Sequence, residues 1–245
     1  MLRGSILCIV HQRTSYPARL GTLFMEQGFV LDVRCPNIGQ ALPETTENYA
    51  ATLMFGGPQS AFEDHIPCIP TEINWIDKAI EGAAPFVGVC LGAQILARAL
   101  GAKVWRHPME HVEIGYTEIH PTQAGQAHFN GPMKVFQWHK DGFDLPSGAI
   151  LLASGGTEFP NQFFRYDEHC YALQFHPEVT IDVVKRWTIQ GAHMLDRPGA
   201  MAREEQIRLY PTLDPIIERW TRQFVSYIIE LAERRGAAVA PLDEA

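Results

Sequence analysis

The sequence is poor in the features that mark membrane, secreted and nucleic-acid-binding proteins. Its apolar runs fall well short of the ~20 residues that a membrane-spanning helix needs, and the run near the N-terminus is too short for a signal peptide. No basic patch stands out against a formal net charge of -8, so neither a nucleic acid nor a membrane is expected as a partner. The five cysteines are odd in number and form no closely spaced pairs, which predicts a reduced, cytoplasmic protein rather than a disulfide framework.

What is present fits one large α/β domain, or such a domain with an extension. The chain has 245 residues, of which 46% are hydrophobic, enough to bury a sizeable core. In the first hundred residues, short apolar segments without strict alternation take turns with helical patterns, as for parallel strands buried on both faces. This order predicts an open, mostly parallel twisted sheet with helices on both faces. The expected strands are 5–10, 29–34, 51–55 and 85–89, and the expected helices are 17–27 and 72–81, the second with Thr71 as its N-cap.

From about residue 103 to residue 175 the pattern changes to successive strands separated by turn residues. Some of these strands are expected to form a small antiparallel annex, and others to return to the main sheet. A helix over residues 181–195, capped by Thr180, then completes a domain predicted to span residues 1–195. The expected strands of this part are 112–120, 134–138, 150–153, 162–166 and 170–175.

Residues 196–236 are predicted to form a C-terminal helical extension packed on the domain, followed by a disordered tail over residues 237–245. A loop containing Tyr210 and Pro211 is expected first, and then a helix with Asp214 as its cap and Pro215 in its first turn. The apolar stripe of this helix is interpreted as packing on the protein's own core, with a homodimer contact as the alternative. The stripe consists of Ile217, Trp220, Phe224, Ile228 and Leu231.

Cys90 stands between a short apolar segment, 85–89, and a helical pattern over residues 91–100. Gly88 and Gly92 flank it two residues away on either side, which is the spacing of a nucleophile elbow. At the N-terminus of a helix, the backbone N–H groups and the helix dipole favour a thiolate, the reactive form of cysteine. The alternative is a buried structural cysteine.

A thiolate nucleophile needs a base, and the base needs a group that orients it. His176-Pro177-Glu178 supplies such a pair, because Pro177 holds the segment extended and residues two apart in an extended chain face the same side. A surface turn is the alternative for this motif in isolation. Acyl chemistry also needs donors for an oxyanion, and the N–H of Leu91 is one candidate. Gly56-Gly57, after the strand at 51–55, fits the second, although an ordinary turn before Pro58 would look the same.

Three segments together resemble the class I glutamine amidotransferase family, the type with a Cys-His-Glu triad. They are residues 56–58, 88–94 and 174–178, and their order and separations along the chain are similar to those of the family. The resemblance covers roughly residues 5 to 185 and implies the flavodoxin-like class I glutaminase fold. Residues 136–141 are similar to the substrate-binding loop of the GMP-synthase-like branch.

The resemblance implies a role for each matching residue. Cys90 would be the nucleophile, His176 the general base and then acid, and Glu178 the carboxylate that orients His176. The other implied site residues bind the oxyanion or the substrate: Gly56, Gly57 and Leu91 at the oxyanion, Gln94 at the amino-acid end of the substrate, and His139 and Asp141 along the site.

The implied activity is hydrolysis of glutamine to glutamate and ammonia through a γ-glutamyl thioester, with no cofactor and no metal. His107 and His111 are four residues apart, but no third ligand of matching spacing accompanies them. No synthetase domain and no glycine-rich ATP loop is recognised in the sequence, so ammonia is expected to pass to a separate synthase subunit. Two alternatives remain open: hydrolysis of γ-glutamyl peptides or amides, and a non-catalytic regulatory or binding protein with the same fold.

Overall fold

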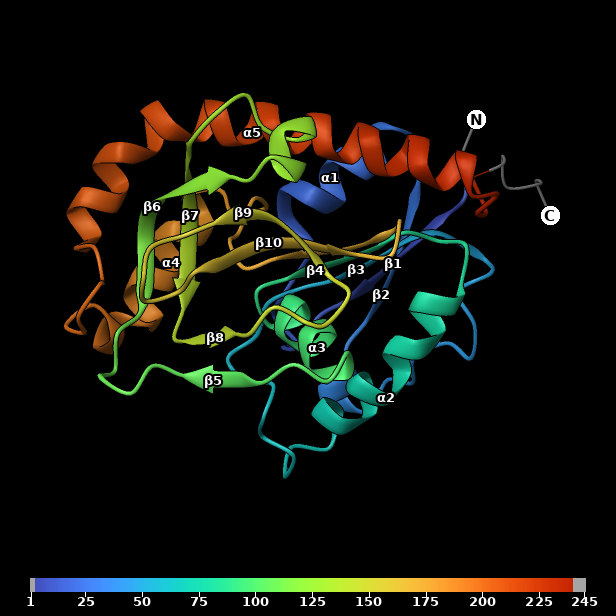
Figure 1. Ribbon diagram of the computed structural model, residues 1–245, viewed down its shortest axis with the longest axis horizontal. Helices are drawn as coiled ribbons and strands as arrows, with labels where there is room; N and C mark the ends of the chain where they lie inside the picture. The colour runs from blue at the N-terminus through green and yellow to red at the C-terminus, as the bar shows by residue number, and fades with distance from the viewer. Residues whose placement is uncertain (1–2, 240–245) are drawn as a thin grey trace.

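The computed structural model describes residues 3–239, which form a central sheet covered by helices on both faces (Figure 1). The main sheet has nine strands in the order β2-β1-β3-β4-β11-β10-β9-β6-β7. Its first five strands are parallel and its last four are antiparallel to their neighbours. The parallel strands are β2 (Val30–Arg34), β1 (Ser5–Ile9), β3 (Tyr49–Met54), β4 (Phe86–Val89) and β11 (Cys170–Leu173).

The antiparallel half continues the main sheet, and a separate two-stranded sheet lies beside it. This smaller sheet pairs β5 (Val104–Arg106) with β8 (Asp141–Phe143). A small antiparallel annex is therefore present as predicted, but the five strands predicted in this part all belong to the main sheet, and the annex is formed by two short strands that the sequence analysis did not identify. The antiparallel strands of the main sheet are β10 (Asn161–Tyr166), β9 (Ile150–Ser154), β6 (Glu113–Pro121) and β7 (Met133–His139).

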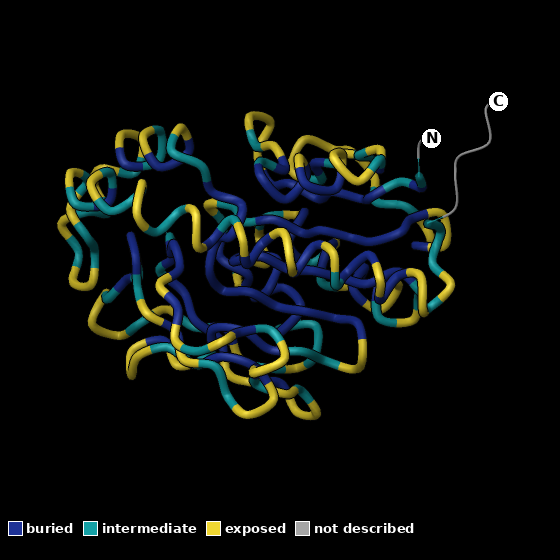
Figure 2. Tube along the Cα trace, turned by 90° about the horizontal axis from the view of Figure 1, so that it is seen from above, coloured by how far each residue is buried: buried dark blue, intermediate teal, exposed yellow. Residues whose placement is uncertain are grey.

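Two apolar cores separate the sheet from its helices. α1 (Ala18–Glu26) and α5 (Arg203–Arg234) pack on one face, and α2 (Cys68–Glu81) and α3 (Leu91–Ala99) pack on the other (Figure 1). Figure 2 shows the strands as a buried band between exposed helix surfaces. The predicted α/β class with helices on both faces is confirmed; the sheet is mixed, with a parallel and an antiparallel half. Among the described residues, the other helical elements are α4 (Ile181–Gln190) and three short 3-10 helices, η1 (Pro36–Ile38), η2 (Ala124–Ala127) and η3 (Ala192–Met194).

The predicted strands and the first helix match the structure to within about two residues at most ends, but the prediction for α2 is wrong at its start. The helix begins at Cys68, one turn before the expected Thr71 cap. Pro70 is tolerated there because the first turn of a helix leaves its N–H groups unpaired in any case. Thr71 lies inside the helix, where its hydroxyl donates to the Pro67 carbonyl at 2.7 Å. Glu72 is therefore in the second turn and fully buried.

The C-terminal part also differs from the prediction. The helix expected over residues 181–195 ends at Gln190, and η3 follows; Thr180 occupies the N-cap position without a side-chain hydrogen bond. α5 begins at Arg203 and runs through the expected loop, with Pro211 and Pro215 inside it. Burial of apolar side chains of its first half, such as Leu209 and Leu213, against the core offsets what each proline loses in backbone hydrogen bonding.

The apolar stripe of α5 is buried against the protein's own core, as the favoured interpretation of the sequence held; its members are 1–6% exposed. Asp214, expected as a cap, forms an ion pair with Arg19 instead. Of the predicted disordered tail, residues 240–245 lie outside the described residues, and the division into a domain and an extension stays a prediction.

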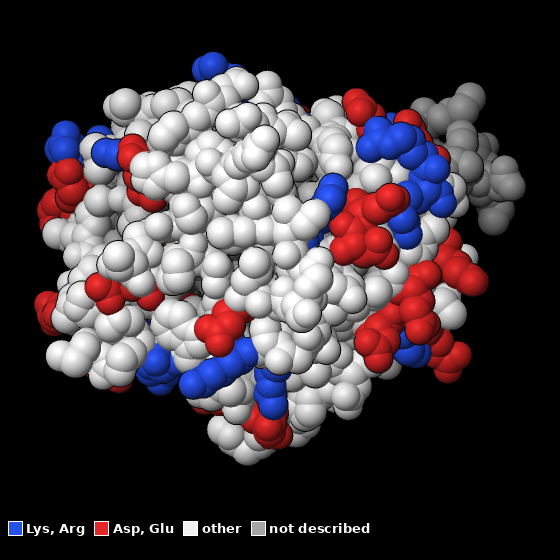
Figure 3. All heavy atoms as spheres, viewed as in Figure 1, with Lys and Arg blue, Asp and Glu red and all other residues white. Residues whose placement is uncertain are grey.

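Between residues 3 and 239, no helix combines the length and the apolar composition that a membrane crossing requires. Figure 3 shows charged side chains of both signs around the rim of one face, with a mostly uncharged centre. This face therefore offers no continuous surface of a single charge.

Candidate active site

The candidate site lies where four adjacent parallel strands end. Ligands of open α/β sheets bind outside the carboxyl ends of the strands, and the strand order here brings the ends of β1, β3, β4 and β11 side by side. Within three residues of the carboxyl end of each of these strands, the chain has a polar residue or a glycine. These residues are His11 after β1, Gly56 after β3, Cys90 after β4 and His176 after β11.

Cys90 forms the sharp turn between β4 and α3 that its spacing predicted. Its backbone has φ 51° and ψ -105°, a conformation rare for a residue with a side chain and typical of a strained nucleophile elbow. The flanking glycines are needed for space. A Cβ at Gly88 would lie 2.5 Å from the Gly92 carbonyl oxygen, and one at Gly92 would lie 2.1 Å from that of Met54.

The thiol of Cys90 is set apart from the other cysteines by its place at a helix N-terminus and on a cavity wall. Burial raises the pKa of the Cys68 thiol to about 11 and that of Cys170 to about 12, and it also raises the pKa values of Cys8 and Cys35. These four thiols are therefore poor nucleophiles near neutral pH.

His176 and Glu178 form a buried pair beside Cys90. The Nδ1 atom of His176 lies 2.7 Å from Oε1 of Glu178. Its Nε2 atom is buried and has no hydrogen-bond partner among the described residues. The ring and the cysteine meet over Gly56, where an added Cβ would lie 2.9 Å from Cε1 of His176 and 3.4 Å from Cβ of Cys90. The predicted nucleophile, base and carboxylate are thus brought together in one place.

The charges around His176 favour its protonated form. Burial by itself lowers the pKa of this imidazole, but the Glu178 carboxylate and the Cys90 sulfur raise it, and the net result is a pKa of about 10 against the ordinary 6.5. A histidine that holds a proton next to a thiol is poised to act as a proton donor to a leaving group.

The two residues predicted to supply oxyanion donors, Gly57 and Leu91, line the same cavity. Gly56 and Gly57 line the cavity with Leu91 and Cys90. Leu91 is the first residue of α3, so its N–H has no partner within the helix. The N–H of Gly57 has no hydrogen-bond partner among residues 3–239. Both predicted donors are therefore free to bind an anionic oxygen.

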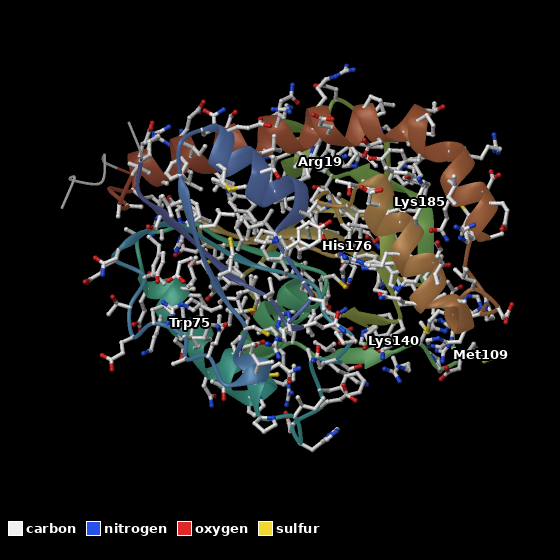
Figure 4. The ribbon with its side chains drawn as sticks, turned by 180° about the vertical axis from the view of Figure 1, so that it is seen from behind. Arg19, Trp75, Met109, Lys140, His176 and Lys185 are labelled. Carbon is white, nitrogen blue, oxygen red and sulfur yellow. The ribbon has the colours of Figure 1, made fainter. Side chains whose placement is uncertain are left out.

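The loop that carries the His176–Glu178 pair is tied to α1 and α5. Arg19 donates its backbone N–H to the Glu178 carbonyl at 3.2 Å and its guanidinium to the Pro177 carbonyl at 3.3 Å. The same guanidinium pairs with Asp214 of α5. Figure 4 shows Arg19 and Lys140 on either side of His176 in the middle of the molecule. The C-terminal helix thus helps to hold the loop of His176 and Glu178 in place.

The cavity extends well beyond Cys90, with a volume of about 360 Å³. Its lining includes Arg186 and Trp187 of α4, residues of η3 and of the segment after β1, and Lys140 between β7 and β8. Trp187 packs edge to face on His176 with ring centroids 5.0 Å apart. No acidic side chain forms an ion pair with Lys140 or Arg186 in the part of the chain that the structure describes. These two positive charges in the lining favour an anionic group.

The remaining predicted site residues line the cavity but are largely engaged with the protein. Gln94 donates its amide nitrogen to the Asp141 carbonyl at 3.0 Å and to Gln174 at 3.2 Å. The Asp141 carboxylate binds Arg106 and Ser60. The predicted residues Gln94, Asp141 and His139 all line the cavity, but the carboxylate of Asp141 is bound to residues of the cavity wall. The two nitrogens of His139 face the Asp141 carbonyl at 3.1 Å and Glu113 at 2.9 Å.

The sequence analysis missed a second buried histidine–carboxylate pair next to the site. His11 follows β1, and its Nε2 atom lies 2.8 Å from Oε2 of Glu72 on α2. A signal was present, because His11 follows a buried strand as Cys90 does. The predicted start of α2 hid its partner by placing Glu72 at an exposed helix end. No group of three or more potential metal ligands is found among residues 3–239.

Comparisons with known proteins identify the family of this chain. The family model for class I glutamine amidotransferases matches residues 19–190, and the chain belongs to that family. A glutamine amidotransferase-like protein of Salmonella typhimurium, YfeJ, is 32% identical over 169 residues, which cover 65% of this chain and 70% of that protein. A glutamine-hydrolysing GMP synthase of Hydrogenovibrio crunogenus is 31% identical over 160 residues, and the chain spans only 27% of its length.

Solved structures agree at the level of the whole chain. A glutamine amidotransferase from Thermotoga maritima superposes with a TM-score of 0.83 and 26% identity over 93% of this chain and 98% of that one. A glutamine amidotransferase from Methylobacillus flagellatus gives a TM-score of 0.87 over 100% of this chain and 99% of that one, at 23% identity, which shows the shared fold.

Proposed function

We propose that the protein hydrolyses the γ-amide of glutamine or of a related γ-glutamyl compound, with Cys90 as the nucleophile. The observation that carries this proposal is the meeting of three groups: a thiol at a strained elbow, the buried His176–Glu178 pair, and two backbone N–H groups that have no hydrogen-bond partner among residues 3–239. Membership of the class I glutamine amidotransferase family supports it. The chemistry requires Cys90 as a free thiol, which fits a reducing compartment such as the cytoplasm.

In the first half of the reaction, the Cys90 thiolate attacks the γ-carbonyl carbon, and the resulting oxyanion accepts hydrogen bonds from the N–H groups of Gly57 and Leu91. His176 gives its proton to the nitrogen as the C–N bond breaks, so that ammonia leaves and a γ-glutamyl thioester remains. Glu178 holds the imidazole in position and stabilises its cation. Gln94 lines the cavity, and we assign its Oε1 to accept a hydrogen bond from the substrate's ammonium group.

In the second half, neutral His176 takes a proton from water, and the hydroxide attacks the thioester carbon. The C–S bond breaks, glutamate leaves, and the thiolate and the imidazolium are restored. When the substrate is glutamine, the ammonia is either released or passed to a synthase in a separate chain. The GMP synthases among the relatives support such a partner, because they are named as glutamine-hydrolysing.

A second candidate substrate class is favoured by the size and charge of the cavity. A volume of about 360 Å³ lies in the range of sites that hold drug-sized ligands. Lys140 and Arg186 are among the residues that line it. A γ-glutamyl peptide, whose leaving group ends in a carboxylate, would use this space and these charges.

Labelling with a glutamine-derived electrophile, followed by mass spectrometry, tests the nucleophile. We expect the adduct on Cys90 and glutamate release in the wild type that is lost in Cys90→Ala. A label on another residue, or full activity in Cys90→Ala, would contradict the mechanism. Comparing glutamate release from glutamine and from γ-glutamyl dipeptides then separates the two substrate classes. A Cys90 adduct without turnover of either substrate would favour a protein that needs a partner or acts by binding alone.

A further inference from the structure

The second histidine–carboxylate pair lies directly behind the proposed oxyanion site. β1 and β3 are neighbours, with Ile9 opposite Met54, so that His11 beyond one strand end meets Gly56 beyond the other. The imidazole of His11 is completely buried, as is Glu72. One ring nitrogen, Nε2, faces the Glu72 carboxylate at 2.8 Å, and the other, Nδ1, faces the carbonyl oxygen of Gly56 at 3.3 Å.

A buried carboxyl group of this kind is unfavourable unless it is paired. The second oxygen of Glu72, Oε1, has no hydrogen-bond partner among the described residues. An apolar pair of the same size would fill this space without that penalty. The pair therefore calls for a role other than filling the core.

Glu72 determines which nitrogen of His11 carries a hydrogen towards Gly56. A carbonyl oxygen only accepts hydrogen bonds, so Nδ1 must be the donor. If Glu72 is ionised, it accepts from Nε2 of an imidazolium whose Nδ1 is also protonated. If the shared proton sits on Glu72, the carboxyl donates to Nε2 and the neutral ring keeps its hydrogen on Nδ1. Both arrangements leave a donor pointing at the Gly56 carbonyl.

The carbonyl of Gly56 and the N–H of Gly57 belong to one peptide unit. The unit is trans, so the two bonds point in opposite directions. Two consecutive glycines leave this unit free to rotate, and a rotation would turn the carbonyl oxygen towards the site in place of the N–H. His11 also packs closely against the next residue, since a Cβ at Gly57 would lie 2.6 Å from Cβ of His11.

We propose that His11, held by Glu72, is a positioning residue that fixes the Gly56–Gly57 peptide so that the Gly57 N–H faces the oxyanion. The inference rests on the proposed function only for the identity of the anion. The orientation of the peptide is a property of the protein alone and is measured separately.

The test uses His11→Phe, which keeps a ring but removes both hydrogen bonds, with His169→Phe as a matched control. His169 is also fully buried and its Nε2 faces a backbone carbonyl, that of Ala79, at 3.3 Å, but it lies outside the site. In crystal structures we expect the Gly56 carbonyl to point at His11 in the wild type and to rotate in His11→Phe. The His169→Phe variant should keep the wild-type orientation.

Kinetics provide the second measurement. We expect kcat for glutamate release to fall ~10²-fold in His11→Phe, near the loss of one oxyanion donor, with KM changed much less. Alkylation of Cys90 by iodoacetamide forms no oxyanion, so its rate should stay near that of the wild type. The His169→Phe variant should keep both rates.

Glu72→Gln tests the role of the carboxyl without emptying its space. The side-chain amide that this variant introduces can donate to Nε2 of His11 and so keep the hydrogen on Nδ1, whereas the side chain introduced by Glu72→Leu cannot. We expect Glu72→Gln to retain most of the wild-type kcat, and Glu72→Leu to resemble His11→Phe.

An unrotated Gly56–Gly57 peptide in His11→Phe, or a kcat equal to that of the wild type, would overturn the inference. An equal fall in turnover and in alkylation would also overturn it, because that pattern indicates general damage to the site. If the wild type hydrolyses no γ-glutamyl compound, the proposed function fails, and the crystal structures still decide whether His11 orients the peptide.

Discussion

Two buried histidine–carboxylate pairs stand on either side of the Gly56–Gly57 turn, with similar bonds but different surroundings. His176 and Glu178 are 2.7 Å apart, and His11 and Glu72 are 2.8 Å apart. In the first pair the second ring nitrogen has no partner among the described residues and lies at the cavity. In the second pair it is bound to a backbone carbonyl.

The difference between these two pairs shows that the chemistry of a histidine is set by what its second nitrogen faces. A free nitrogen beside a thiol can exchange a proton with the reacting atoms. A nitrogen bound to a carbonyl has its hydrogen committed and can only hold that carbonyl in place. The first pair is therefore assigned to proton transfer and the second to the geometry of the oxyanion site.

Replacing His176 should have the largest effect. In His176→Ala we expect kcat to fall ~10⁴–10⁶-fold, as when the base of a nucleophile–base unit is removed. The alkylation of Cys90 should slow as well, because the group that takes its proton is lost. The loss of alkylation is what separates this variant from His11→Phe. If His176→Ala and His11→Phe lowered turnover equally and left alkylation intact, the two pairs would share one role.

The contrast between the pairs also explains what the sequence could and could not predict. His176 and Glu178 are two residues apart, and Pro177 makes their geometry local, so a short motif predicted it. His11 and Glu72 are 61 residues apart and meet only because β1 and α2 pack together. No local pattern carries that information, and a one-turn error at the start of α2 concealed the buried position of Glu72.

Prediction of the fold from the sequence was likewise limited to features that are local in the chain. The alternation of strands and helices predicted the parallel half, because each unit there is local in sequence. The prolines of α5 predicted a loop, because local preference opposes a helix there. In the structure the segment is helical, because its side chains pack against residues that are distant in the sequence. The role of Asp214 changed with it, from a helix cap to the partner of Arg19.

Replacing the carboxylate of a pair should lower activity less than replacing His176. The effect on the pH profile should differ between the two pairs. Because Glu178 is one of the groups that raise the pKa of His176 to about 10, activity that needs the imidazolium should be lost as the pH rises through that value. In Glu178→Gln we expect this loss of activity at high pH, the alkaline limb of the pH profile, to move down by about 1–3 pH units, the usual effect of one adjacent charge. The pH profile of kcat/KM measures the shift.

The free energy of unfolding should also decrease as the pH rises. Since the pKa of His176 is raised in the folded state, its contribution to the free energy of unfolding is fully present below pH 6.5 and is lost as the pH rises through about 10. In Glu178→Gln this loss should occur at lower pH. Glu72→Gln is the control, because Glu72 is not among the groups that shift His176. An equal displacement of the limb in both variants would contradict the division between the pairs.

The smallest effect is expected at a third pair, His139 and Glu113. Both nitrogens of His139 are bound, one to Glu113 and one to the Asp141 carbonyl, although the residue lines the cavity. His139 therefore resembles His11 in its bonds, but the carbonyl that it holds does not belong to the oxyanion peptide. In His139→Gln we expect KM to rise about threefold to tenfold, the range for one lost hydrogen bond, with kcat little changed. Steady-state kinetics with glutamine or a γ-glutamyl dipeptide measure both constants. A fall in kcat as large as that in His11→Phe would mean that any bound histidine at this edge of the sheet controls turnover, and that the Gly56 contact of His11 is not what sets it apart.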